Sequence, residues 1–316
     1  MRQKVILDVD PGIDDAIAII TALQVKDIEV LGISTVNGNV GSKFGALNTL
    51  KILDVVGKTD IIPVIQGASR PIVNRPLQPW LRKRLEEIHG KGGLGGIGFE
   101  TVKRKPATKM TFADFINSIA KNYGKNEISI IATGPLTNVA KALVNNRFFA
   151  ESISEICIMG GAYGLASDVF GNVTPYAEFN FYSDPEAAKI VLQSNIDLNI
   201  KVIGLDVTQK PKCAVDAKVL EILNSKKNKN RTAGFIASLL RFVLLKNKFF
   251  YLHDVFAVAM FEKPSLFRFK KGNIDITLRG KMRGHSSFHE SNISGNLLVA
   301  ADVNEDGFND FSQLFK

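Results

Sequence analysis

The chain has 316 residues, 45% of them hydrophobic, and a formal net charge of +9. This length and apolar content allow a large core, but the dispersed basic residues, without interleaved aromatics or a recognition motif, argue against nucleic acid as a partner. We find no apolar run of membrane-spanning length, which argues against a membrane partner, and an apolar strand pattern begins directly after Lys4. That start lacks the form of a signal peptide, so we expect a cytoplasmic protein.

The first element is a strand that leads into a tight turn and a helix. An apolar run ends at Asp10, a Pro-Gly turn follows, and apolar residues at helical spacing continue to Leu23. Side chains alternate along a strand, so Asp8 and Asp10 share one side, while Asp14 and Asp15 fall in the first helical turn. A helix N-terminus stabilises one nearby anion by only about 0.3–1 kcal/mol. We therefore expect a hard cation, Ca²⁺ or Mg²⁺, to balance these carboxylates, rather than a simple N-cap.

Strand and helix patterns alternate through the first part of the chain. Residues 28–36 form a β-rich run that stops in a polar loop, so we expect Asn39 to lie beside Asp10. Residues 43–56 have helical spacing, and residues 61–65 indicate another short strand. This alternation predicts an α/β fold with an open, mostly parallel, doubly wound (Rossmann-like) sheet flanked by helices, in a single domain spanning residues 1–316. In such sheets ligands bind at the carboxyl ends of the strands.

A glycine-rich run at residues 89–98 interrupts this rhythm. Residues 93–98 match GxGxxG literally, but they follow a charged helical stretch rather than a buried strand, so we reject a dinucleotide site. A mobile active-site loop suits the glycines better. His89, at the start of this run, would on its own more often be a surface histidine than a functional one.

Three later strand patterns also end in polar turns. Residues 128–132 lead into Thr133, residues 153–159 end at Met159, and residues 198–205 lead into a DVT turn. Beyond the second of these strands, Glu178 and Asn180 are two apart, so in extended chain they project to one side and suit sugar hydroxyls. Residues 231–250 indicate a long helical stretch, and the His-Asp pair at 253–254 opens the next helix, where a simple N-cap is the more common role.

Six segments, in this order along the chain, resemble the signatures of the inosine-uridine-preferring nucleoside hydrolases. They are DVDPGIDDA at 8–16, HGKGGLGG at 89–96, ATGPLTN at 132–138, GNVTPYAEFN at 171–180 together with DPEAA at 184–188, GLDVT at 204–208, and HDVFAVA at 253–259. The resemblance covers almost the whole chain. It implies hydrolysis of the N-glycosidic bond of ribonucleosides to ribose and free base, in nucleoside salvage, by a homodimer or homotetramer.

The resemblance also implies roles for individual residues. Ca²⁺ would be bound by Asp10, Asp15, Asp254 and the Thr133 carbonyl, and Asp10 would take the proton from the attacking water. The other catalytic residues implied are His89, which contacts ribose, and His253, which faces the departing base. The residues implied to bind substrate are Asp14, Asn39, Met159, Asn172, Glu178, Phe179 and Asn180.

The two histidines favour the inosine-uridine-preferring branch, because the purine-specific branch is expected to stack the base between tryptophans, and the only tryptophan here is Trp80. Two other functions stay open. A strand ending in DxD also suits a Mg²⁺-dependent phosphatase of the haloacid dehalogenase type, but that motif expects Thr or Val at Gly12 and leaves the His253-Asp254 pair unexplained. A nucleoside-binding protein without turnover would bind ribonucleosides tightly and release no base.

Overall fold

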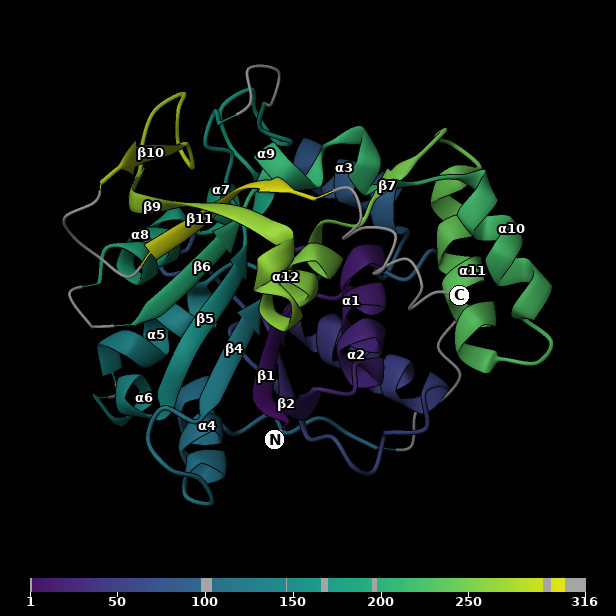
Figure 1. Cartoon of the computed structure of the whole chain (residues 1–316), viewed down its shortest axis with the longest axis horizontal. Coiled ribbons are helices and arrows are strands. Elements are labelled where there is room, and N and C mark those ends of the chain that lie inside the picture. Colours follow the sequence, from purple (N-terminus) through teal and green to yellow (C-terminus); the bar gives the residue numbers. More distant parts are fainter. Residues whose placement is uncertain are drawn as a thin grey trace.

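A nine-stranded sheet forms the centre of the computed structural model, which describes residues 2–97, 104–145, 147–165, 170–194, 198–291 and 297–304 (Figure 1). The strand order is β10-β9-β11-β6-β5-β4-β1-β2-β3. The strands are β1 (Gln3–Val9), β2 (Ile28–Thr35), β3 (Val64–Gln66), β4 (Ile128–Ala132), β5 (Ile153–Met159), β6 (Asn199–Ile203), β9 (Phe267–Ile276), β10 (Ser286–Glu290) and β11 (Leu297–Val303). β9 pairs antiparallel with β10 and β11, and every other neighbouring pair is parallel. The predicted open, mostly parallel sheet is thus confirmed.

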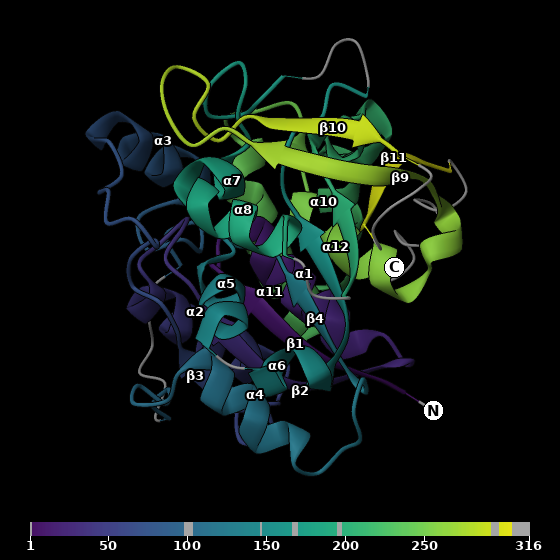
Figure 2. The ribbon, with the colours of Figure 1, turned by 90° about the vertical axis from the view of Figure 1, so that its left-hand side faces the viewer.

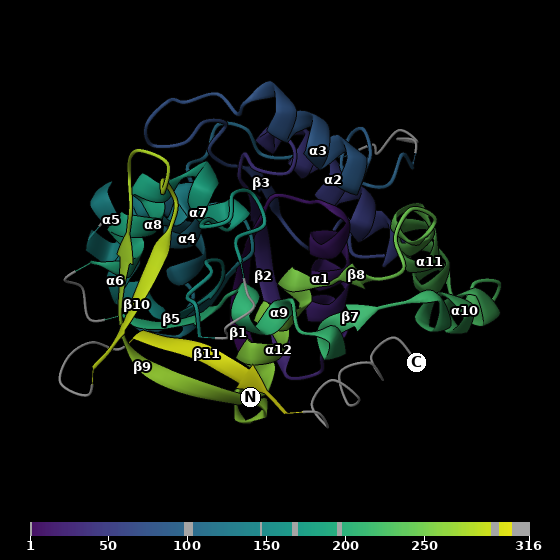
Figure 3. The same ribbon diagram turned by 90° about the horizontal axis from the view of Figure 1, so that it is seen from above.

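Helices cover both faces of the sheet, because its central strands are apolar on both sides (Figure 3). Along β1, Val5 and Leu7 pack on one face, and Ile6 between them packs on the other. The helices on the first face are α1 (Ile13–Gln24), α2 (Ser42–Val55), α11 (Arg231–Leu244) and α12 (His253–Glu262). Those on the second face are α4 (Phe112–Ala120), α5 (Thr137–Asn145), α6 (Arg147–Ser152) and α8 (Pro185–Leu192).

Shorter elements complete the described part of the chain. They are α3 (Pro79–His89), α7 (Phe179–Ser183), α9 (Leu205–Thr208), α10 (Ala217–Lys226), the single 3₁₀ turns η1 (Pro211–Cys213) and η2 (Pro264–Leu266), and the two-stranded sheet of β7 (Ala214–Val215) and β8 (Phe250–Tyr251). Figure 1 shows α3, α7 and α9 at the same end of the molecule, the end towards which the parallel strands run, and Figure 2 shows α3 and α7 there from a second side. No helix of the described residues is long and apolar enough to cross a membrane.

The direction of the winding changes at β1. From β1 the chain builds β2 and β3 on one side and then returns to place β4 on the other side. Such a reversal leaves a crevice at the carboxyl ends of the two strands, here β1 and β4. The sequence did not predict the β9–β10 hairpin, and three of the boundaries predicted above differ by more than one residue: β3 begins at Val64, β6 ends at Ile203 and α11 ends at Leu244. The predicted GxGxxG match ends at Gly98, outside the described residues.

Candidate active site

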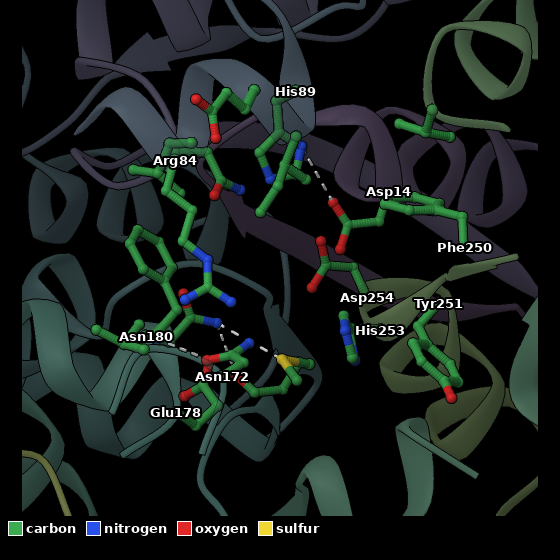
Figure 4. Close-up of a pocket in the computed structure, with 18 of the residues that line it drawn as sticks. Asp14, Arg84, His89, Asn172, Glu178, Asn180, Phe250, Tyr251, His253 and Asp254 are labelled. Carbon is green, nitrogen blue, oxygen red and sulfur yellow. Dashed lines mark hydrogen bonds and ion pairs between the residues drawn. The ribbon is translucent and has the colours of Figure 1, made fainter. Parts of the chain in front are cut away.

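A cavity of about 540 Å³ opens at the carboxyl ends of the central strands, a volume typical of small-molecule sites (Figure 4). Among the site residues predicted from the sequence, Asp10 and Asp15 are fully buried behind its lining. The others line the cavity: Asp14, Asn39, His89, Thr133, Met159, Asn172, Glu178, Phe179, Asn180, His253 and Asp254. The fold therefore brings together residues from β5 and from the segments that follow β1, β2 and β4, although they are far apart in the sequence.

Four buried aspartates lie at the floor of the cavity or directly behind it, and we call Asp10, Asp14, Asp15 and Asp254 the acidic cluster. Carboxylate oxygens of Asp14, Asp15 and Asp254 lie within 4.8 Å of one another. Asp10 adjoins this group, since its backbone N–H donates to Oδ1 of Asp15 at 3.3 Å. The predicted ligand set included Asp10 in place of Asp14, so this group of three contains two of the three predicted carboxylate ligands, Asp15 and Asp254.

Asp15 ties together three chain segments at this point. It lies in the first turn of α1, where Oδ2 accepts the backbone N–H of Gly12 at 3.1 Å. The same oxygen accepts Nδ2 of Asn39, from the loop after β2, at 3.2 Å. Its Oδ1 accepts the hydroxyl of Thr133, directly after β4, at 2.7 Å. The backbone N–H of Asn39 in turn donates to Oδ2 of Asp10 at 2.6 Å, which confirms that Asn39 lies beside Asp10.

The acidic cluster carries more negative charge than its surroundings balance. Burial, and then the charge of Asp15, raises the pKa of Asp14 to about 7. The pKa of Asp254 is raised well above its usual range by burial and then by Asp14 and Asp15. Burial also raises the pKa of Asp10, with Asp15 as the next cause. No Lys or Arg is among the fully buried residues of the described chain. The cluster therefore either holds protons or binds a cation.

Two oxygens of the acidic cluster lack any partner, which tests whether a cation fits. Within the described residues, Oδ1 of Asp10 and Oδ1 of Asp14 are buried and accept no hydrogen bond. A buried carboxylate oxygen without a donor is costly unless a cation contacts it. Carboxylates and carbonyls are the ligands of hard divalent ions, so the residues fit such an ion. The Thr133 carbonyl, the fourth predicted ligand, accepts Nδ2 of Asn180 at 2.7 Å and keeps a second lone pair.

His89 lies at the end of α3, where the glycine turn holds it against the start of α1. Its Nδ1 accepts the backbone N–H of Ile13 at 3.1 Å and lies 3.9 Å from Oδ1 of Asp14. Burial lowers the pKa of His89 to about 4, so the ring is neutral near pH 7 and forms no ion pair with Asp14. The turn needs glycine, because Gly93 has φ +94° and a Cβ there would lie 2.8 Å from the carbonyl of Pro11.

His253 is the first residue of α12 and faces the cavity from the other side (Figure 4). Its Nδ1 lies 2.7 Å from the hydroxyl of Thr208, at the end of α9. The ring of Tyr251 is 5.8 Å away, centroid to centroid. Burial lowers the pKa of His253 to about 4, so this ring is also neutral near pH 7.

The expectation of an extended chain at residues 178–180 is wrong, because Glu178 caps a short helix. Its carboxylate accepts the backbone N–H groups of Asn180 at 2.7 Å and Phe181 at 3.1 Å, which starts α7. It also accepts the N–H of Gly161 at 2.9 Å. Glu178 and Asn180 still both line the cavity, and Oδ1 of Asn172 there is buried without a partner. An unpaired amide oxygen at this position can accept a hydroxyl group of a ligand.

Some lining residues were not predicted. Arg84 comes from α3, one helical turn before Ile88, and Phe250 and Tyr251 come from β8 (Figure 4). Thr208 was missed as a partner of His253, although it belongs to the GLDVT segment that the sequence analysis had already singled out. Trp80 is 49% exposed on α3 and is not among the residues that line the cavity.

Comparison with known proteins identifies relatives over nearly the full length. The family model "Inosine-uridine preferring nucleoside hydrolase" matches residues 5–310. Uridine nucleosidase 1 of Arabidopsis thaliana is 35% identical over 90% of this chain and 81% of its own. The pyrimidine-specific ribonucleoside hydrolase RihA of Escherichia coli is 34% identical over 98% of this chain and 97% of its own. A purine-preferring ribonucleoside hydrolase from Gardnerella vaginalis aligns with a TM-score of 0.86 at 29% identity, covering 99% of this chain and 98% of its own.

Proposed function

This chain belongs to the family of inosine-uridine preferring nucleoside hydrolases and hydrolyses ribonucleosides, and from that premise we propose that it does so with Ca²⁺, with an inosine-uridine type of preference, in nucleoside salvage. The family and the enzyme class predicted from the sequence are confirmed. The observation that supports the finer proposal most directly is the pair of unpartnered carboxylate oxygens, on Asp10 and Asp14, beside the other acids of the cluster. A proton, a cation or a polar group of a ligand can satisfy them, and only a cation would also balance the charge of the other ionised carboxylates.

The metal would be held by Asp10, Asp15, Asp254 and the carbonyl of Thr133, with Asp14 close enough to contribute. A bound divalent cation lowers the pKa of water in the site, so that the water becomes a better nucleophile near neutral pH. An all-oxygen set without Cys or His favours Ca²⁺ or Mg²⁺, and the larger number of available oxygens favours Ca²⁺. The sequence resemblance also points to Ca²⁺.

Asp10 would act as the general base. As the water oxygen bonds to C1′ of ribose, Asp10 accepts a proton from that water, and the electron pair of the breaking C1′–N bond goes to the base. Positive charge grows on the sugar ring during this step, and the carboxylates of the acidic cluster stabilise it. The products are ribose and the free base, which takes up a proton at its nitrogen.

The remaining lining residues would hold the two halves of the substrate. Asp14, Asn39, Asn172, Glu178 and Asn180 would bind the ribose hydroxyls, with His89 at the sugar. Met159 and Phe179 would supply apolar contact, as they line the same cavity. His253, which lies across the cavity from His89, would face the base (Figure 4).

Uridine is the first substrate to test. The sequence relatives include a uridine nucleosidase and a pyrimidine-specific hydrolase, and the lining has no tryptophan that could stack a purine. We also propose one hydrolase domain over residues 1–316, a homodimer or homotetramer, and a cytoplasmic location without nucleic-acid or membrane partners. These four points stay predictions.

The test is base release from uridine, cytidine, inosine and adenosine, with Ca²⁺ and after chelation. We expect release from uridine that stops on chelation and returns with added Ca²⁺. Release restored only by Mg²⁺ would contradict the choice of ion. Tight uridine binding without release would instead indicate a binding protein, and phosphate release from 4-nitrophenyl phosphate would support the phosphatase.

A further inference from the structure

The ring of His253 is held from behind by a hydroxyl group. Oγ1 of Thr208 lies 2.7 Å from Nδ1 of the ring. Thr208 is fully buried, whereas the ring lines the cavity beside Asp254 and Tyr251 (Figure 4). Within the described part of the chain, no group forms a hydrogen bond with Nε2 of His253. That nitrogen is therefore available to a molecule in the cavity.

The Thr208 hydroxyl has one proton and two acceptors within reach. One acceptor is Nδ1 of His253, and the other is the carbonyl oxygen of Gly204 at 3.3 Å. That carbonyl already accepts the backbone N–H groups of Val207 and Thr208, each at 3.1 Å. Because a carbonyl has two lone pairs, and 3.3 Å is long for an O–H···O bond, the geometry favours donation of the Thr208 proton to the ring over donation to Gly204.

We propose that Thr208 is a positioning residue that donates its proton to Nδ1 of His253 and so fixes the ring in the tautomer with its own proton on Nε2. A neutral imidazole has a single N–H, so a donor at Nδ1 places that N–H on the other nitrogen. The ring then offers the cavity a hydrogen-bond donor. With the opposite tautomer, Nδ1–H would donate to Thr208 and the cavity would face an acceptor.

This inference rests on the proposed function, in which His253 faces the departing base. As the C1′–N bond breaks, its electron pair goes to the base, and negative charge builds there. A hydrogen bond from Nε2–H stabilises that charge, whereas a lone pair at Nε2 would repel it. Thr208 therefore acts on the rate of bond cleavage, through His253, rather than on the binding of the nucleoside.

Two variants and a matched control test the role of the hydroxyl. Thr208→Val removes it at nearly constant volume, and Thr208→Ser keeps it. Thr49→Val is the control, because Thr49 is also buried and its hydroxyl donates to the carbonyl four residues earlier, Gly45, at 2.9 Å, without a histidine partner. Any general cost of removing such a hydroxyl appears equally in the control.

The kinetic readout compares two leaving groups in the Ca²⁺-loaded, full-length protein. For uridine, we expect Thr208→Val to lower kcat about tenfold to a hundredfold, as for a lost hydrogen bond to a developing charge, with KM changed less than about threefold. For 4-nitrophenyl riboside, whose phenolate is already a stable anion, we expect kcat within about twofold of wild type. Thr208→Ser should restore uridine hydrolysis to within about threefold, and Thr49→Val should match wild type.

A spectroscopic readout tests the tautomer without relying on activity. In protein with ¹⁵N-labelled histidine, loss of the His253 signals in His253→Gln assigns them, and their shifts report which nitrogen carries the proton. We expect the Nε2–H form in wild type and Thr208→Ser, and a mixture in Thr208→Val. A wild-type ring with its proton on Nδ1 overturns the inference.

The two readouts separate failure of the inference from failure of the proposed function. If wild type releases no base from any ribonucleoside and no phenolate from the riboside, the proposed function fails, and the tautomer is still decided by the labelled histidine. If wild type is active and Thr208→Val slows both substrates equally, or slows neither relative to Thr49→Val, Thr208 does not act through His253 and the inference is wrong.

Discussion

Buried carboxylates occur in this protein in two settings, and only one of them is complete without a ligand. Asp184, which caps α8, is fully buried, and its oxygens accept two backbone N–H groups and the hydroxyl of Thr137 at 2.6–3.1 Å. The acidic cluster is buried as deeply, but two of its oxygens accept no hydrogen bond and its members raise one another's pKa. Both settings use the same residue type at similar burial.

Asp184 and the acidic cluster differ in how many hydrogen-bond donors surround their carboxylates. A lone carboxylate can be kept in the core by N–H and O–H groups, and it then stabilises the loops that supply them. Several carboxylates in contact repel one another, and hydrogen bonds of ordinary strength do not offset that repulsion. Substitution should therefore have opposite consequences in the two places. At Asp184 stability is lost and activity is kept. At Asp10, Asp14 and Asp254 activity is lost and the metal-free fold is not weakened, whereas Asp15 also accepts hydrogen bonds that join three chain segments.

The largest effect is expected for Asp10→Asn. The amide keeps the shape but can neither accept the proton of the attacking water nor contribute its charge to a cation, so we expect kcat for uridine to fall about 10³-fold or more. The measurement is base release at saturating uridine and Ca²⁺. The matched control is Asp184→Asn, for which we expect kcat within about twofold of wild type and a free energy of unfolding lower by about 1–3 kcal/mol.

Asp10→Asn and Asp184→Asn could both lose activity only in proportion to the loss of folded protein. In that case the acidic cluster and Asp184 would not differ in the way proposed. Circular dichroism and urea unfolding of each variant separate the two causes. If folded Asp10→Asn retained more than a tenth of wild-type kcat, Asp10 would not be the base, and Asp14 would be the next residue to test.

The second prediction concerns metal and stability. At a Ca²⁺ concentration about 100 times its Kd, the ion should raise the free energy of unfolding of wild type by about 2.7 kcal/mol. In Asp254→Asn we expect this increase to vanish, while the metal-free variant is more stable than metal-free wild type by about 1–2 kcal/mol, because one of the mutually repelling charges is gone. Urea unfolding with Ca²⁺ and with chelator measures both. A metal-free variant less stable than wild type would mean that Asp254 is structural, like Asp184.

The third prediction is the pH dependence of the metal-free protein. The folded-state pKa of Asp14, about 7, exceeds the unfolded value near 3.9, so between these values the folded state binds more protons. Stability must therefore fall as pH rises from about 4 to about 7, and we expect a loss of about 2–3 kcal/mol between pH 5 and pH 8. Ca²⁺-loaded protein should show a smaller loss, because the ion takes the place of the protons.

Asp8 also contributes to the pH dependence in this third measurement. Burial raises the pKa of Asp8 to about 7, although hydrogen bonds from Ser34 and Asn138 act in the opposite direction. Its contribution is present with and without metal and cancels in the difference between the two forms. In Asp14→Asn we expect that difference to shrink. An unchanged difference would assign the pH dependence to other groups.

The centre of the fold could be predicted because its signals are local. Apolar runs that end in Pro-Gly, Asn-Gly or Thr-Gly turns and open amphipathic helices define β1, β2 and β4 with their helices, and alternation then specifies the parallel sheet. The β9–β10 hairpin could not be predicted in this way, because one of its faces is half exposed and its pairing with β11 is a long-range choice. Asn180 was misplaced in extended chain because α7 begins at Phe179, directly after its N-cap Glu178. The same Glu178 carboxylate also accepts the N–H of Gly161, a tertiary contact that sequence spacing does not reveal.

The site could be predicted as a set of residues but not as a network. Motifs located Asp15, Thr133 and His253 correctly at the cavity or behind it. They did not indicate that Thr133 donates its hydroxyl to Asp15, or that Thr208 contacts His253, because each pair joins segments more than 40 residues apart. Which acids lack donors also depends on packing, and this distinction separates the acidic cluster from Asp184.

The smallest effect on stability is expected for Asp302, which pairs with Lys210 but is partly exposed to solvent. The hydrogen bond from Lys210, at 2.6 Å, lowers the pKa of Asp302 to about 2. A folded-state pKa below the unfolded one near 3.9 stabilises the fold above pH 4, and this stabilisation is lost as pH falls towards 2. Because the side chain is 38% exposed, solvent screens the pair, and Asp302→Asn should lower the free energy of unfolding at pH 7 by less than about 1 kcal/mol.

A double-mutant cycle of Asp302→Asn with Lys210→Met, by urea unfolding at pH 7 and pH 3, isolates this pair. We expect a coupling energy of a few tenths of a kcal/mol at pH 7 and less at pH 3, with kcat unchanged throughout. A coupling above about 2 kcal/mol would place Asp302 with Asp184, as an acid on which the fold depends. The number of hydrogen-bond donors and the solvent exposure together then divide the acidic residues of this protein into three groups. Asp302 is paired and partly exposed, and Asp184 is paired and buried. The acidic cluster is buried with too few donors, and there we propose that a cation supplies the missing partner.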